Sequence, residues 1–91
     1  MNKSELIETL AKETNLPSRT ASSIVGTILD AMTDTLVKGE NVEIRGFGSF
    51  SVRKYEAYTG RNPKTGEETQ VKAKKLPFFK VGKELREAVD R

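Results

Sequence analysis

The chain contains neither cysteine nor histidine, and it has no tryptophan. The lack of cysteine excludes disulfide bonds, thiol nucleophiles and thiolate metal sites, and it fits a cytosolic compartment. The lack of histidine removes imidazole ligands and the usual general base near neutral pH. No apolar run approaches the roughly 18 residues that a membrane-spanning helix needs, and the N-terminal residues show no signal-peptide core. We therefore expect no membrane insertion and no export.

Apolar residues are also scarce, at 35% of 91 residues. A chain this short and this polar is only marginally stable as an isolated monomer, so a partner chain is plausible. Branched apolar and aromatic residues nevertheless recur at regular spacing, which indicates one folded domain and not a disordered chain.

Basic residues gather in the second half of the chain. The net charge is only +3, but residues 51–91 hold eleven of the sixteen Lys and Arg residues and six of the thirteen acidic ones. Such a basic segment is either an ordinary solvated surface or a binding surface for a polyanion such as nucleic acid.

The first 40 residues are expected to form two helices. Asn2 begins a capping box, and apolar residues then recur on one helical face. Pro17 interrupts this pattern. A wide apolar stripe then runs over residues 21–36, and Gly39 is well placed to end the second helix.

Two helices joined by a short turn suggest a helix-turn-helix motif, which we reject. A recognition helix in the major groove needs exposed basic and polar residues. The second helix has one early base, Arg19, and carries Asp30 and Asp34. It is therefore assigned to the core.

From residue 41 the apolar period changes to two, which is typical of strands. Residues 46–48 are expected to form a turn between two strands. Residues 53–75 follow as a long β-hairpin, with a turn at 60–66 signalled by Gly, Asn-Pro and Thr-Gly. Roughly ten residues per leg would reach about 30 Å. The hairpin has almost no large apolar side chains, so we expect a mobile arm that is ordered by what it grips.

The arm has the chemistry of a DNA-binding ribbon. A two-stranded ribbon fits a DNA groove, and basic side chains along it neutralise phosphates without reading the sequence. Pro63, near the tip, is rigid and apolar; it either shapes the turn or is a wedge that enters a base step from the minor groove. The basic residues of the arm are Arg53, Lys54, Arg61, Lys64, Lys72, Lys74 and Lys75.

Several motifs make the chain similar to the HU/integration host factor family of bacterial nucleoid proteins, over essentially its whole length. They are Arg-Gly-Phe-Gly-Ser-Phe at 45–50, Thr-Gly-Arg-Asn-Pro-Lys-Thr-Gly at 59–66, and Pro77, Phe79-Lys80, Gly82-Lys83 and Leu85. The resemblance implies an α+β fold in an intertwined dimer. Its expected parts are a helical base (1–40), a three-stranded antiparallel β saddle (41–52 and 76–81), a DNA-embracing arm (53–75) and a short C-terminal helix (82–91).

The resemblance also implies a function and its residues. It implies a histone-like protein of the cytoplasmic nucleoid that binds duplex DNA in the minor groove through two arms. Such a protein bends and compacts DNA with little sequence specificity and favours bent, nicked or kinked duplexes. Phe47, Phe50 and Phe79 would pack across the dimer, and Pro63 would intercalate. The expected DNA-binding residues are Lys3, Arg45, Arg53, Lys54, Tyr55, Tyr58, Arg61, Asn62, Pro63, Lys64, Lys72, Lys74, Lys75, Lys80, Lys83 and Arg86.

Within that family, residues 3–8 and 43–46 look more like the integration host factor β subunit than HU. In that subunit the residues matching Glu43 and Arg45 help to select a DNA site; the alternative is that they are simply the exposed face of a strand. A homodimer and a site-preferring heterodimer with a paralogous chain, acting in recombination, replication and transcription, both stay open. Tyr55 and Tyr58 stand where the family usually carries Arg, which removes two phosphate-binding charges from the arm.

Two other function classes have less support. A nuclease would need clustered carboxylates for metal ions, whereas the acids here are spread over helix surfaces apart from the single pair Glu67-Glu68. A single-strand binder would need stacking aromatics on a sheet face, and only Tyr55 and Tyr58 qualify. We expect no enzyme activity, no cofactor and no metal, with RNA as a secondary ligand at most.

Overall fold

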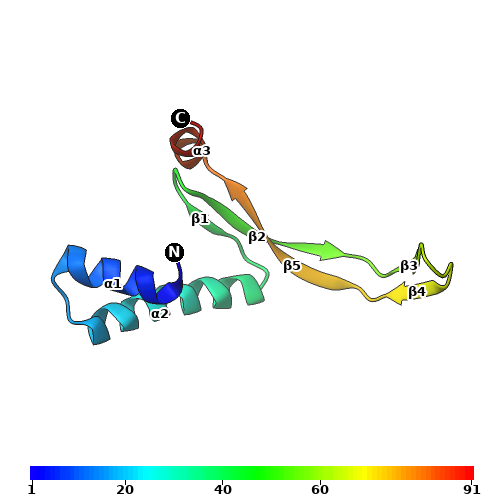
Figure 1. Cartoon of the computed structure of the whole chain (residues 1–91), viewed down its shortest axis with the longest axis horizontal. Coiled ribbons are helices and arrows are strands. Elements are labelled where there is room, and N and C mark those ends of the chain that lie inside the picture. The colour runs from blue at the N-terminus through cyan, green and yellow to red at the C-terminus, as the bar shows by residue number, and fades with distance from the viewer.

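The computed structural model describes all 91 residues as a helical base, a central sheet and a projecting arm (Figure 1). It extends over 58 × 33 × 29 Å because the arm points away from the helices. None of its helices is long and apolar enough to cross a membrane. The elements are α1 (Lys3–Thr14), α2 (Ser18–Val37), β1 (Val42–Ile44), β2 (Gly48–Tyr55), β3 (Tyr58–Arg61), β4 (Glu68–Val71), β5 (Lys74–Val81) and α3 (Lys83–Val89).

The two long helices begin and end at local signals in the sequence. The Asn2 side chain accepts a hydrogen bond from the Glu5 N–H at 2.9 Å and caps α1. Asn15 then adopts a left-handed conformation with φ of 56°, and Pro17 precedes α2. Gly39, with φ of +81°, follows the end of α2. The predicted helical base is confirmed, and α1 packs against α2.

The central sheet has the strand order β1-β2-β5, with both pairs antiparallel. Paired residues share a face because side chains alternate along a strand. One face is largely apolar, and we call it the inner face: Val42, Ile44, Phe50, Val52, Pro77, Phe79 and Val81. The opposite, outer face is mostly polar and carries Glu43, Ser49, Ser51, Arg53, Leu76, Phe78 and Lys80. The predicted three-stranded antiparallel saddle is confirmed.

The arm is not the continuous hairpin that the sequence predicted. Pairing between β2 and β5 stops after Tyr55↔Lys74, and a separate two-stranded sheet, β3-β4, makes up the distal ribbon. Residues 56–57 and 72–73 lie unpaired between the two sheets. None of these four residues has a large apolar side chain, so the cross-strand side-chain contacts that stabilise strand pairing are missing here. The predicted long β-ribbon arm is confirmed, but its pairing is interrupted at these residues.

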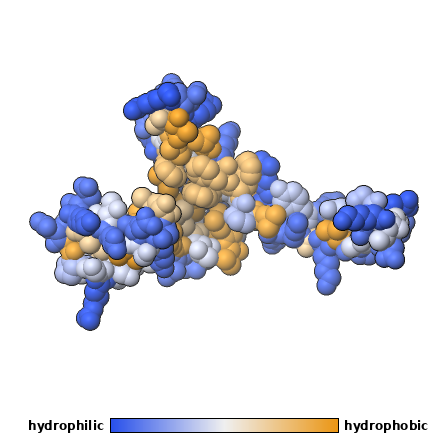
Figure 2. Space-filling view, viewed as in Figure 1, coloured by the Kyte–Doolittle hydropathy of each residue, from blue (hydrophilic) through white to orange (hydrophobic).

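The single chain encloses almost no core. Only three of its 91 residues are buried, namely Ala21, Val25 and Gly48. Large apolar side chains stay open to solvent, with Ile28 54% and Phe47 46% exposed. Figure 2 shows apolar surface over the central sheet, between a hydrophilic arm and the hydrophilic outer part of the helical base. Contiguous apolar surface of this kind normally marks an interface.

Candidate nucleic-acid interface

The outer face of the sheet carries a row of basic side chains. Arg53 lies over the ring of Phe78, with its guanidinium carbon 3.4 Å from the ring centroid. Lys80 lies opposite Ser49 on the same face, and Lys74 lies opposite Tyr55 where β2 ends. The stacked guanidinium is held in place while its N–H groups remain exposed, which suits contact with phosphate oxygens.

Two of the predicted DNA-binding lysines lie on the other side of the sheet. Lys54 and Lys75 are paired in register on the inner face, where like charges directly opposite one another repel. They line a hollow of about 300 Å³ with the end of α2 at Leu36–Gly39. The carbonyl groups at a helix C-terminus carry partial negative charge, so α2 offsets part of this repulsion. The structure thus separates these two lysines from Arg53 and Lys74.

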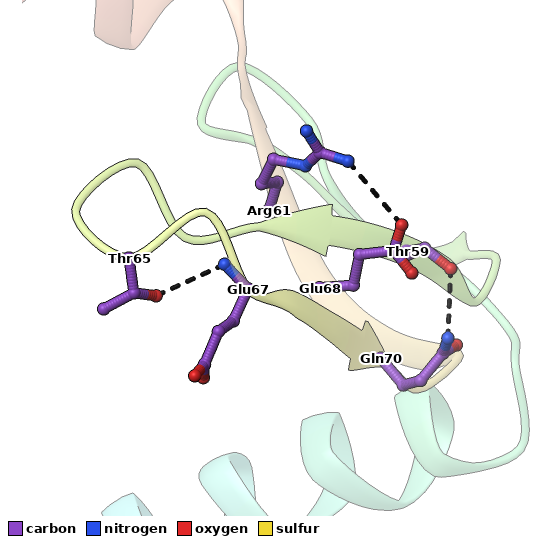
Figure 3. A network of polar contacts seen from close by, with 6 residues as sticks. All are labelled: Thr59, Arg61, Thr65, Glu67, Glu68 and Gln70. Carbon is purple, nitrogen blue, oxygen red and sulfur yellow. Dashed lines mark hydrogen bonds and ion pairs between the residues drawn. The ribbon is translucent and has the colours of Figure 1, made fainter.

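The distal ribbon is closed by polar cross-strand pairs (Figure 3). Arg61 Nη2 lies 3.7 Å from Glu68 Oε1, and both side chains are largely exposed. One pair further from the tip, Gln70 Nε2 donates to Thr59 Oγ1 at 3.2 Å. An exposed ion pair contributes little stability, so Arg61 is readily released to a phosphate.

The tip of the arm is a turn over residues 62–67. The Asn62 N–H donates to the Glu67 carbonyl at 2.8 Å, and the Gly66 N–H donates to the Asn62 carbonyl at 2.7 Å. Thr65 Oγ1 accepts from the Glu67 N–H at 3.3 Å (Figure 3). Every residue of this turn is exposed, including Pro63 and Lys64. The arm therefore ends in a rigid apolar ring with basic side chains around it.

At the opposite end of the sheet, α3 is fastened to the turn between β1 and β2. The Gly82 N–H donates to the Phe47 carbonyl at 2.8 Å, and the Leu85 N–H donates to the Gly46 carbonyl at 3.0 Å. An open hollow of about 310 Å³ beside this junction is bordered by Glu43, Arg45 and Lys80. The structure thus brings the predicted site-selecting pair next to a basic residue of β5.

The exposed Lys72 lies in the unpaired segment between β4 and β5, and three further predicted contacts lie on the helices. Lys3 is the first residue of α1, and Lys83 and Arg86 lie in α3; all three are exposed. No group of three or more acidic side chains is close enough together to hold a metal ion.

A family model described as "Bacterial DNA-binding protein" matches residues 1–90. The chain belongs to this family, the HU/integration host factor proteins. The integration host factor subunit β of Ralstonia nicotianae is 54% identical over 92 residues, which cover 100% of this chain and 67% of that protein. The β subunit of Burkholderia cenocepacia is 54% identical over 91 residues, which cover 99% of this chain and 85% of that protein.

Solved structures of HU proteins share the fold. The cocrystal structure of Anabaena HU with DNA superposes with a TM-score of 0.87 at 36% identity, covering 98% of this chain and 97% of that one. HU from Thermotoga maritima gives a TM-score of 0.70 at 37% identity, covering 98% of both chains. The predicted fold class and the predicted family are both confirmed.

The three phenylalanines predicted for the dimer core of this HU/integration host factor protein form one cluster. Phe79 lies between the other two, with ring centroids 4.7 Å from Phe50 and 5.7 Å from Phe47. Phe79 is still 38% exposed, so the cluster is open on one side. Packing of these rings across two chains stays a prediction.

The two tyrosines at the break in the arm occupy different surroundings. Tyr55 ends β2 on the outer face, 43% exposed. Tyr58 begins β3 opposite Val71, and its ring would lie 3.6 Å from a Cβ placed on Gly60. Within β3 and β4, Gly60 and Val71 are half-buried and all other residues are exposed. Tyr58 is therefore part of a small apolar contact in the ribbon as well as a predicted DNA contact.

Sequence reasoning missed Phe78 as a functional residue. As part of an apolar run with Phe79 it resembles a core residue, although adjacent strand residues point to opposite faces. That alternation, applied to the pair Phe78-Phe79, would have placed one ring on the polar face, where it supports Arg53.

Proposed function

We propose that this chain is an architectural DNA-binding protein that grips the minor groove of duplex DNA with its arm and bends the duplex at Pro63. The observation that carries the proposal is the row of exposed basic side chains on the outer face of the sheet, together with the exposed proline and its basic neighbours at the arm tip. Exposed Lys and Arg side chains neutralise phosphates and release counterions, which supplies affinity without sequence preference.

Bending requires a second element besides charge. An apolar wedge inserted from the minor groove unstacks one base step at a cost of about a few kcal/mol, and HU and integration host factor belong to the class of proteins known for it. Pro63 suits this role because it is rigid, apolar and exposed at the apex. The bent duplex then meets more basic surface on the body, including Lys3, Lys83 and Arg86.

A second copy of the chain completes the proposed DNA-binding particle. The open phenylalanine cluster and the exposed apolar residues of α2 supply the interface, and two arms would then approach one duplex from two sides. We place this dimer in the cytoplasmic nucleoid, where it compacts DNA. RNA would be a secondary ligand.

The proposal separates gripping from bending, and two variants test this. Pro63→Ala keeps every charge, so we expect modest loss of affinity for linear DNA, loss of most ligase-mediated circularisation of short fragments, and a greater preference for nicked DNA. Replacing Lys72 and Lys74 together by Gln should weaken binding to every duplex. If Pro63→Ala circularises short DNA as well as the parent at matched occupancy, Pro63 only shapes the turn.

A second candidate function is that of a site-preferring subunit in a heterodimer. It is favoured by the hollow that Glu43, Arg45 and Lys80 share, and by the integration host factor β subunits among the relatives. On this proposal Arg45→Ala lowers affinity for a selected sequence by about 1–3 kcal/mol more than for random DNA. Competition gel shifts with both duplexes measure the difference, and equal losses on both would leave Arg45 an ordinary phosphate contact.

A further inference from the structure

The Asn62 side chain accepts a hydrogen bond across the proline at the arm tip. Asn62 Oδ1 accepts a hydrogen bond from the Lys64 N–H at 2.9 Å, so the two residues on either side of Pro63 are tied together. Pro63 has no N–H and donates no backbone bond of its own. The two backbone bonds of Asn62, to Glu67 and from Gly66, close the base of the same turn.

From this geometry we infer that Asn62 is a positioning residue: it holds Pro63 in the orientation of the wedge and acts on DNA through Pro63. The inference rests on the proposed bending function. It changes the role of Asn62 within the predicted DNA-binding set, because its carbonyl oxygen is engaged inside the turn.

No side-chain packing in the tip can take over this role. All residues from Arg61 to Gln70 are exposed, so no packing holds the apex. The Arg61–Glu68 and Thr59–Gln70 pairs close the ribbon on the body side of the turn (Figure 3). The Thr65 hydroxyl contact, at 3.3 Å, is longer and lies on the returning leg. Local hydrogen bonds alone therefore decide how often Pro63 points outward in a fixed direction.

Loss of the Asn62 contact should reduce DNA bending and leave the affinity for the phosphate backbone unchanged. Pro63 can insert into a base step only in one orientation, and only a correctly formed turn presents it in that orientation. The amount of bent DNA is therefore proportional to the fraction of arms whose turn is correctly formed. One local hydrogen bond changes such a fraction by about three- to tenfold. No charge is lost, so the salt dependence of binding is unaffected.

The competing role is a direct contact between the Asn62 amide and DNA. The two roles use different atoms, since the turn uses Oδ1 and a direct contact to a base or phosphate acceptor would use Nδ2. Serine separates them: its hydroxyl oxygen can accept from the N–H two residues on, but serine has no amide N–H₂ group.

The experiment compares Asn62→Ala, Asn62→Ser, Pro63→Ala and, as the matched control in the same turn, Thr65→Ala. Circularisation of a short duplex by ligase at matched occupancy reports bending, and gel-shift titration on a gapped duplex reports binding that needs no wedge. We expect Asn62→Ala to lose about three- to tenfold in circularisation, with affinity for gapped DNA within about twofold of the parent. Asn62→Ser should regain most of the loss, and Thr65→Ala should lose less than Asn62→Ala.

The outcomes distinguish this inference from the proposed function. If Asn62→Ser is as defective as Asn62→Ala, or if Asn62→Ala bends as well as the parent while Pro63→Ala does not, the positioning role is wrong and the wedge stands. If Pro63→Ala bends as well as the parent, the wedge itself is wrong, and any effect of Asn62 on bending then has another cause.

Discussion

Gly48 is the residue at which the sheet and the phenylalanine cluster meet. It begins β2 and is one of the few buried residues of the chain. A Cβ at this position would lie 2.6 Å from the Lys80 carbonyl oxygen and 2.6 Å from the Phe79 ring. Because one of these neighbours is backbone, a side chain here would force β5 away from β2 and disturb the Phe79 contacts.

We predict that Gly48→Ala lowers the free energy of unfolding by about 2–4 kcal/mol, as overpacking in a tight site does. Gly39→Ala is the matched control, since Gly39 has a positive φ but open space around it; its loss should be about 1 kcal/mol. Urea denaturation at one chain concentration measures both. A loss for Gly48→Ala no larger than that for Gly39→Ala would contradict the packing argument.

At the scale of elements, the sequence predicts the helices well and the arm only in part. Asn2, Pro17 and Gly39 are end signals that act within one turn of helix, so they can be read from a single segment. The break at residues 56–57 and 72–73 has no such signal, because neither dipeptide contains glycine or proline. Whether a ladder continues depends on side chains facing each other across two strands, and register is visible only in the structure.

The distal ribbon offers a test of Tyr58, at a position where the resemblance leads us to expect an arginine. Tyr58→Arg should steepen the slope of log K against log[salt] by about 0.9 for each arm bound, since each added charge neutralises one more phosphate. Tyr58→Gln, which removes the ring without adding charge, should leave the slope unchanged. Gel-shift titrations of random-sequence DNA over a range of salt concentrations give both slopes. An identical slope for Tyr58→Arg would mean that this position does not face the backbone.

At the scale of the whole molecule, the low apolar content predicted a partner, and the structure shows which surface is left uncovered. Periodicity alone does not locate that surface, because it depends on the register that sets Phe50 opposite Phe79 and on the turn that adds Phe47; these three rings were expected from the resemblance. The faces on which the expected DNA contacts lie likewise follow from the register. Lys54 and Lys75 face the helical base, whereas Arg53 and Lys74 face outward.

We predict that the chain is a dimer at micromolar concentration. Sedimentation equilibrium should give about twice the chain mass of 10.1 kDa, because exposed rings and α2 residues gain most of their burial from a second copy. Ile28→Glu, which places a charge on the exposed face of α2, should lower both the apparent mass and the unfolding temperature. A folded species of single-chain mass would contradict the prediction.

Because a single chain buries only three residues, the amount of folded protein should depend on the concentration of the chain. For the proposed dimer, folding and association are one reaction, so at low concentration the number of paired molecules rises with the square of the number of chains. A twofold dilution then lowers the concentration of the DNA-competent dimer about fourfold. DNA that captures only the paired form draws more chains into it by mass action, so the duplex promotes the assembly of the protein that bends it.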